Sequence, residues 1–311
     1  MMLNVLFSAK PSTWDEYRDP LSAAIEAENL TVNLVTEHDP ASVDYIVFAP
    51  NGPVTNFSPF TKTKAVMSLW AGVETVVGNG TLTQPLLRMV DHGLTAGMVE
   101  WVVGHALRHH LGMDAHITQQ DGIWRDTIFP PIAMERPVAV LGMGELGAAC
   151  AKALSALGFP VRGWSRSPKT VEGIACFHGD AGLSGALAGA EIIILLLPDT
   201  LNTRHILNAE TLALAKRGAF VINPGRGPLI DDEALLAALD SGQVGHATLD
   251  VFDVEPLPQN HAFWSHPQVT VTPHIASTTR AITASQVIAQ QIARGERGEA
   301  FLHVVDRTAG Y

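Results

Sequence analysis

The segment 137-PVAVLGMGELGAACAKALSAL-157 decides the fold of this chain. β-Branched and apolar residues precede glycines 142, 144 and 147, and an alanine-rich stretch follows them. An ordinary glycine turn is the alternative, but G-x-G-x-x-G between a strand and a helix is typical of dinucleotide-binding proteins. The helix N-terminus would offer N–H groups to the phosphates. We therefore predict a dinucleotide site whose loop consists of Gly142, Met143, Gly144, Glu145 and Leu146.

The stretch 161-VRGWSRSPK-169 indicates which dinucleotide is bound. Ser165 lies 23 residues after Gly142, where an acid would accept hydrogen bonds from the adenosine ribose and repel a 2′-phosphate. Arg166 instead offers a guanidinium that matches a phosphate, and Ser165 and Ser167 add donors. A solvated polar turn is the alternative. The sequence favours NADPH over NADH.

Bulk composition excludes several classes of protein. The 311 residues are 47% hydrophobic and carry a formal net charge of −11, which argues against nucleic acid or an anionic membrane as a partner. Cys150 and Cys176 form no CxxC motif, and the longest apolar run, 192–197, is too short for a membrane span. His105 and His109 have helical metal-ligand spacing but no HExxH acid, so we predict no metal site. The sequence thus predicts a soluble cytoplasmic protein.

Two series of alternating strand-like and helix-like segments run along the chain, which indicates parallel sheets with crossover helices. The first series occupies the N-terminal part, and a long helical pattern starts near Leu94. A turn-rich arm follows at 121–137, and the second series starts at Val138. The last amphipathic helix could return to the first domain and make that domain discontinuous.

Polar residues follow the apolar runs of the second series, where parallel strands should end. Because ligands of open α/β sheets lie beyond the carboxyl ends of the strands, these side chains should converge on one edge. They are Thr200, Thr203, Asn223, Arg226, Asp250, Glu255 and His274.

Three of these residues suit the reduction of a 2-oxo acid by hydride transfer. His274 can donate a proton to the carbonyl oxygen, because histidine titrates near operating pH. Glu255 can orient that imidazole and favour its charged form. Arg226 can hold the substrate carboxylate with two parallel hydrogen bonds and polarise the carbonyl. Each alone could be a surface or structural residue, but all three follow strands in the expected order.

The sequence at this point resembles the D-2-hydroxyacid dehydrogenase family nearly end to end. The matching stretches are AGVE (71–74), MVEWVV (98–103), GMGELG (142–147), LLLPDTLNT (195–203), VINPGRGPLID (221–231), LDVFDVEP (249–256) and TPHIAS (272–277).

The resemblance implies a domain organisation and a set of site residues. It implies an α/β fold of two doubly wound parallel-sheet domains, with a Rossmann-type coenzyme domain (98–282) inserted in a flavodoxin-like substrate domain (1–97 and 283–311). It implies that Arg226, Glu255 and His274 are catalytic. The cofactor-binding set comprises the glycine-loop residues already named together with Ser165, Arg166, Ser167, Pro198, Thr203, Asn223, Pro224 and Asp250, the last of which would meet the nicotinamide carboxamide. The substrate-binding set comprises Trp70, Ala71, Gly72, Arg226 and His274.

Within the family, the short chain and WSRSPK are most similar to the glyoxylate/hydroxypyruvate reductase A branch. This similarity implies NADPH-dependent reduction of glyoxylate to glycolate and of hydroxypyruvate to D-glycerate. It also implies a homodimer, across which the arm carrying Trp124 would pack. The loop LWAGVE departs from the family pattern, which more often has glycine before the alanine and aspartate at the end, and 48–53 lacks a tryptophan found in some relatives. Two alternatives stay open: a reductase of a bulkier 2-oxo acid such as phenylpyruvate, and a nucleotide-sensing binding protein.

Overall fold

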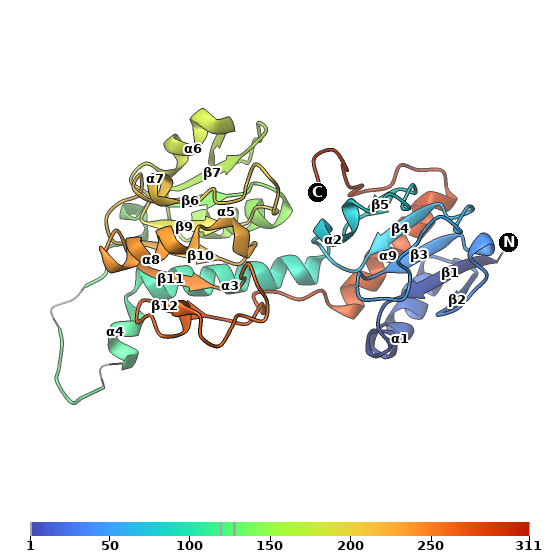
Figure 1. The fold of residues 1–311 in the computed structure, drawn as a ribbon, viewed down its shortest axis with the longest axis horizontal. Coiled ribbons are helices and arrows are strands. Elements are labelled where there is room, and N and C mark those ends of the chain that lie inside the picture. Colours follow the sequence, from blue (N-terminus) through green and yellow to red (C-terminus); the bar gives the residue numbers. More distant parts are fainter. Residues whose placement is uncertain (1, 119, 127–128, 311) are drawn as a thin grey trace. The chain divides into compact units, whose positions relative to one another are not determined.

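The structure is a computed structural model, which describes residues 2–118, 120–126 and 129–310. The chain divides into two compact units (Figure 1). The terminal unit comprises residues 1–94 and 278–311, and the central unit comprises residues 95–277. Within the described ranges, no helix is both long and apolar enough to span a membrane.

The terminal unit contains a parallel sheet with the strand order β2-β1-β3-β4-β5. This is the flavodoxin-like order of a doubly wound sheet. The elements are β1 (Leu3–Ser8), α1 (Pro11–Ala27), β2 (Val32–Val35), β3 (Tyr45–Phe48), β4 (Ala65–Ser68), α2 (Glu74–Val77), β5 (Leu86–Leu87) and α9 (Ala281–Glu296).

Helices α1 and α9 cover one face of this sheet, although more than 250 residues separate them in the sequence. Leu21 of α1 and Ile288 of α9 are buried in one cluster with Val5 and Val47 of the sheet. The apolar face of the final helix is therefore part of the core that the first strands build.

The central unit contains a second parallel sheet, with the strand order β12-β11-β10-β9-β6-β7-β8. If β6 is counted as the first strand of this sheet, the strand order is that of the Rossmann fold, and β12 is one added strand at the edge. The elements are α3 (His92–His110), α4 (Met113–Thr118), β6 (Val138–Leu141), α5 (Glu145–Ala156), β7 (Val161–Ser165), β8 (Ala175–His178), α6 (Gly179–Leu187), β9 (Ile192–Leu195), α7 (Ala209–Leu212), β10 (Ala219–Asn223), α8 (Asp232–Asp240), β11 (Val244–Leu249) and β12 (Val269–Val271).

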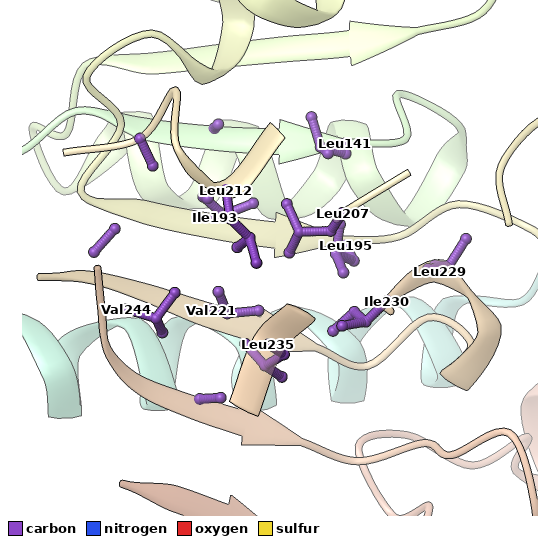
Figure 2. Close-up of a cluster of buried hydrophobic side chains, with 14 of the residues drawn as sticks. Leu141, Ile193, Leu195, Leu207, Leu212, Val221, Leu229, Ile230, Leu235 and Val244 are labelled. Atoms are coloured by element: carbon purple, nitrogen blue, oxygen red, sulfur yellow. The ribbon is translucent and has the colours of Figure 1, made fainter. Parts of the chain in front are cut away.

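Successive residues of the central strands alternate between two cores, because successive side chains of a strand point to opposite faces. Val138 and Val140 lie in the cluster that includes residues of α3 and α5. Leu141 and Ile193 lie in the cluster that includes residues of α6, α7 and α8. Figure 2 shows part of this second cluster, where Leu212 and Leu235 lie over the strands. The continuous apolar runs in the sequence are thus strands buried on both faces.

A buried polar layer joins α3 to the same sheet. His109 is 4% exposed, its Nε2 lies 2.9 Å from Thr248 Oγ1, and its ring stacks on Phe220 with centroids 4.8 Å apart. Burial lowers the pKa of His109 to about 3, with His246 and Arg108 as further causes. Burial likewise lowers the pKa of His246 to about 4.

We expect this layer to make the protein sensitive to acid. In the unfolded chain His109 takes up a proton near its ordinary pKa of 6.5, whereas the folded chain resists protonation until about pH 3. Stability from the neutral ring is therefore present above pH 6.5 and is lost as the pH falls towards 3. When the pH is lowered from 7.5 to 5, the free energy of unfolding should fall by about 2 kcal/mol less in His109→Gln than in the parent. Urea midpoints at the two pH values test this, with the exposed His116→Gln as control; equal acid losses in parent and His109→Gln would contradict it.

Candidate functional site

The glycine loop has the geometry that a pyrophosphate requires. Gly142 has a φ of +111°, and a side chain there would lie 2.4 Å from the carbonyl oxygen of Leu196. A Cβ on Gly147 would lie 1.6 Å from the carbonyl oxygen of Gly142, so only glycine allows α5 this close to β6. By contrast, a Cβ on Gly144 would meet nothing within 4 Å. The three glycines therefore provide the tight turn, the open approach and the close packing predicted from their spacing.

The glycine loop leads into the first turn of α5. The side chain of Met143 is 3% exposed and packs on Gly163, so it faces the core. Glu145 begins α5, whose N-cap Gly144 provides no side-chain cap. The first-turn N–H groups of α5 can thus receive an anion.

The predicted 2′-phosphate loop follows β7. Ser165 is 8% exposed and its Oγ donates to the carbonyl oxygen of Ser167 at 2.8 Å. Arg166 and Ser167 are exposed. The structure therefore leaves the guanidinium and the Ser167 hydroxyl at the surface, while the Ser165 proton is engaged inside the loop.

Two other predicted cofactor loops are held by their own side chains. Thr203 Oγ1 donates to the carbonyl oxygen of Pro198 at 2.7 Å and accepts from the Thr200 N–H at 2.9 Å. Asn223 is 1% exposed, and its side chain donates to the carbonyl oxygen of Arg226 at 2.9 Å. Its Oδ1 accepts from the N–H of Gly225 at 3.1 Å. Both side chains therefore shape loops at the carboxyl edge of the sheet, and direct cofactor contacts stay a prediction for them and for Pro224.

His274 and Glu255 meet at this edge. His274 Nδ1 lies 2.8 Å from Glu255 Oε2, and the two side chains are 54% and 36% exposed. The other carboxylate oxygen, Oε1, accepts from the N–H of Phe252 at 3.0 Å, which holds Glu255 in place. Because Nδ1 faces the carboxylate, Nε2 is the ring atom left to serve a substrate.

The carboxylate of Asp250 holds the histidine loop. Asp250 is fully buried and accepts from Thr272 Oγ1 at 2.5 Å and from the N–H groups of Ile275 and Ala276, each at 2.9 Å. Its backbone oxygen accepts from the N–H of His274 at 2.8 Å. These hydrogen bonds hold the backbone of His274, which has a φ of +55°. Only a few residue types adopt this left-handed conformation readily. The sequence did not reveal this supporting role, and a contact of Asp250 with the nicotinamide carboxamide stays a prediction.

Arg226 follows β10 on the same edge of the sheet. It is half-buried, and its guanidinium Nη1 donates to the carbonyl oxygen of Gly225 at 2.6 Å. The bond from Asn223 to the Arg226 backbone fixes where the side chain leaves the loop. The structure thus brings the predicted cation, acid and histidine to one edge of the sheet, as expected for residues that follow neighbouring parallel strands.

The predicted carboxylate loop lies in the terminal unit, between β4 and α2. The N–H of Trp70 donates to Ser68 Oγ at 3.0 Å, and its carbonyl oxygen accepts from the N–H of Met89. The next N–H groups, those of Ala71 and Gly72, make no hydrogen bond within the described part of the chain. Adjacent N–H groups of this kind suit an anion such as a carboxylate. Trp70 itself is 42% exposed.

The other singled-out residues have structural contacts. His109 packs against Phe220 and Thr248, as described above, and burial and Arg108 lower the pKa of His105. The described residues contain no group of three or more potential metal ligands. Cys150 is fully buried, and burial raises its pKa to about 12.

Comparison with known proteins shows the family of the chain. A family model described as the NAD-binding domain of D-isomer specific 2-hydroxyacid dehydrogenase matches residues 102–276. The glyoxylate/hydroxypyruvate reductase A of Serratia proteamaculans is 41% identical over 256 residues, which cover 80% of this chain and 82% of the relative.

Solved structures extend the likeness to the whole chain. A D-isomer specific 2-hydroxyacid dehydrogenase from Xanthobacter autotrophicus, in complex with NADPH and MES, has a TM-score of 0.91 at 40% identity and 99% coverage of both chains. An NADPH-dependent glyoxylate/hydroxypyruvate reductase from Sinorhizobium meliloti, in complex with NADP and sulfate, has a TM-score of 0.86 at 35% identity, covering 100% of this chain and 99% of that one. The chain therefore belongs to the D-isomer specific 2-hydroxyacid dehydrogenases, a family of NAD(P)-dependent enzymes.

Proposed function

We propose that this enzyme reduces small 2-oxo acids with NADPH, converting glyoxylate to glycolate and hydroxypyruvate to D-glycerate. The observation that carries the proposal is the 2.8 Å pair of His274 and Glu255 on the sheet edge that also holds the glycine loop. The relatives named as glyoxylate/hydroxypyruvate reductases support the choice of substrates.

In this proposal the dinucleotide supplies the hydride, and residues of the chain handle the carbonyl oxygen and the carboxylate. Nε2 of His274 donates a proton to the carbonyl oxygen, since Nδ1 is bonded to Glu255. Arg226 binds the substrate carboxylate through its guanidinium. The N–H groups of Ala71 and Gly72 in the terminal unit are proposed to bind a substrate carboxylate.

Initial rates of NADPH oxidation with glyoxylate, hydroxypyruvate and phenylpyruvate test the function. We expect the two small acids to be reduced with higher kcat/KM than phenylpyruvate. Preference for phenylpyruvate would favour a bulkier substrate, for which the half-exposed Trp70 beside the proposed carboxylate loop offers an apolar surface. NADPH binding without turnover of any 2-oxo acid would favour a nucleotide-sensing protein.

Cofactor choice is proposed to depend on the loop after β7, where NADPH-bound neighbours support NADPH. The double variant Ser165→Asp with Arg166→Ala should prefer NADH. It removes a charge-assisted hydrogen bond of about 1.5–3 kcal/mol and places a carboxylate where a 2′-phosphate would lie. The expected loss for NADPH is thus roughly one to two powers of ten, with NADH little affected. The measurement is the ratio of kcat/KM for the two cofactors at fixed salt; equal losses with both would contradict the assignment.

We further propose that the chain forms a homodimer through the segment around α4. The segment leaves large apolar side chains exposed, including Ile117 at 66%, Trp124 at 90% and Phe129 at 81%. Large apolar side chains that are exposed on a contiguous surface mark protein–protein contacts more often than monomer surfaces. Residues 127 and 128 of the predicted arm lie outside the described residues.

The dimer proposal predicts that Trp124→Ser lowers the molar mass in solution towards the monomer value of 33.2 kDa, measured by light scattering across a dilution series. Ile282→Ser, a change at an equally exposed apolar residue of α9 (67% exposed), should leave the mass unchanged. A parent that is already monomeric at micromolar concentration would refute the proposal.

A further inference from the structure

The edge strand β8 places a histidine next to the predicted 2′-phosphate loop. Strand β8 pairs with β7 in parallel, and the last residues of the two strands, Ser165 and His178, are partners in the register. His178 is exposed. The carboxyl end of β8 therefore lies directly beside the start of the loop that carries Arg166.

Ser165 and His178 also share a face of the sheet. Their neighbours one residue earlier, Trp164 and Phe177, pack in the cluster of α6, α7 and α8. Because side chains alternate along a strand, Ser165 and His178 point to the opposite face, the one that α5 covers. The N-terminus of α5 is the part of that face that the glycine loop presents to a dinucleotide.

The position of His178 is fixed by a contact from β7 itself. Trp164 is 4% exposed, and its Nε1 donates to the carbonyl oxygen of Gly179 at 2.9 Å. This bond fastens the residue after His178 to the strand that ends in Ser165. The two strand ends are thus held together by a side chain as well as by the backbone ladder.

The loop after β7 supplies fewer donors than its sequence indicates. The proton of the Ser165 hydroxyl goes to the carbonyl oxygen of Ser167, so Ser165 is poorly placed to donate to a phosphate. Asp180 in the first turn of α6 is exposed and brings a negative charge two residues after His178. Near the end of β8, the donor that could act together with Arg166 on a phosphate is therefore His178 rather than the start of α6.

We propose that the imidazole of His178 donates a hydrogen bond to the adenosine 2′-phosphate of NADPH and is a specificity-determining residue for that cofactor. The inference rests on the proposed use of NADPH. A hydrogen bond to an ionised phosphate is stronger than one between neutral groups, and an imidazole N–H can make it. NADH has a hydroxyl at this position and gains no such bond.

Direct binding tests the assignment without depending on turnover. Isothermal titration calorimetry with NADPH, NADH and adenosine 2′,5′-bisphosphate at 0.15 M salt would compare the parent with three variants. His178→Ala should raise the Kd of NADPH and of the bisphosphate about tenfold, which is the effect expected from the loss of one charge-assisted hydrogen bond. The Kd of NADH should be unchanged. His178→Gln, which keeps an N–H donor, should recover part of the loss. Lys169→Ala, which removes an exposed cation from the same loop, is the matched control and should have little effect at this salt.

The outcomes separate this inference from the proposed function. A parent that binds NADH as tightly as NADPH would overturn both. A parent that prefers NADPH while His178→Ala binds it unchanged would overturn only the inference. Equal weakening of NADPH and NADH would mean that His178 contacts the adenosine common to both cofactors. An equal loss in Lys169→Ala would mean that any positive charge in this region has the same effect. Either result would overturn the inference.

Discussion

Replacing His274 by alanine is expected to lower kcat by about 10²–10⁴-fold while leaving NADPH binding intact, because a positioned proton donor contributes that much to a reaction. The 2.8 Å contact with Glu255 commits Nδ1, so no other atom of this pair can replace Nε2 as donor. Steady-state rates with glyoxylate, together with a fluorescence titration of NADPH, separate chemistry from cofactor binding.

The backbone at residue 274 dictates the control for this experiment. His274 has a φ of +55°, which alanine adopts at some cost and asparagine tolerates well. His274→Asn should therefore keep the loop conformation and still lose the activity. Glu255→Gln should lose less, because its amide oxygen can still accept a hydrogen bond from Nδ1 of the imidazole. Activity near the parent level in His274→Asn would remove His274 from the mechanism.

The second large effect is expected at Arg226. Arg226→Lys keeps the positive charge but loses the planar pair of donors, so kcat/KM for glyoxylate should fall by about 10²-fold, the order expected for a charge-assisted bond of 3 kcal/mol. The Asn223 hydrogen bond to the Arg226 backbone does not involve the side chain, so the loop should be preserved. Arg204→Lys, in the loop after β9 and 48% exposed, is the matched control. A lysine variant as active as the parent would rule out the two-pronged clamp.

The alternation of strands and helices along the chain could be predicted because the central strands are continuous apolar runs. Strand β9, with four buried residues in Ile192–Leu195, is of this kind. Strand β8 gives no such signal, since Ala175 and His178 are exposed and the strand lies at the edge of the sheet. Because β8 could not be recognised in the sequence, the position of His178 beside Ser165, which depends on the pairing of β7 with β8, could not be predicted either.

The catalytic pair could be predicted from residue type and position, but the support around it could not. The bonds from Asp250 to Thr272, Ile275 and Ala276 join residues more than 20 positions apart. They depend on the register between β11 and β12, which pairs Leu249 with Val271. The resemblance to a family could suggest a ligand contact for Asp250, but only the folded structure reveals the loop that this carboxylate restrains.

The discontinuous terminal unit constrains the order in which the protein can be synthesised and folded. Residues 95–277 form one uninterrupted stretch, so the central unit can fold as soon as that stretch leaves the ribosome. The first strands leave the ribosome earlier, but the core on one face of their sheet lacks Ala284, Ile288 and Ile292 until α9 has been synthesised. Nascent chains must therefore carry an apolar sheet face that α1 covers only in part until α9 has been synthesised. We expect this interval to be the one in which chaperones bind the chain.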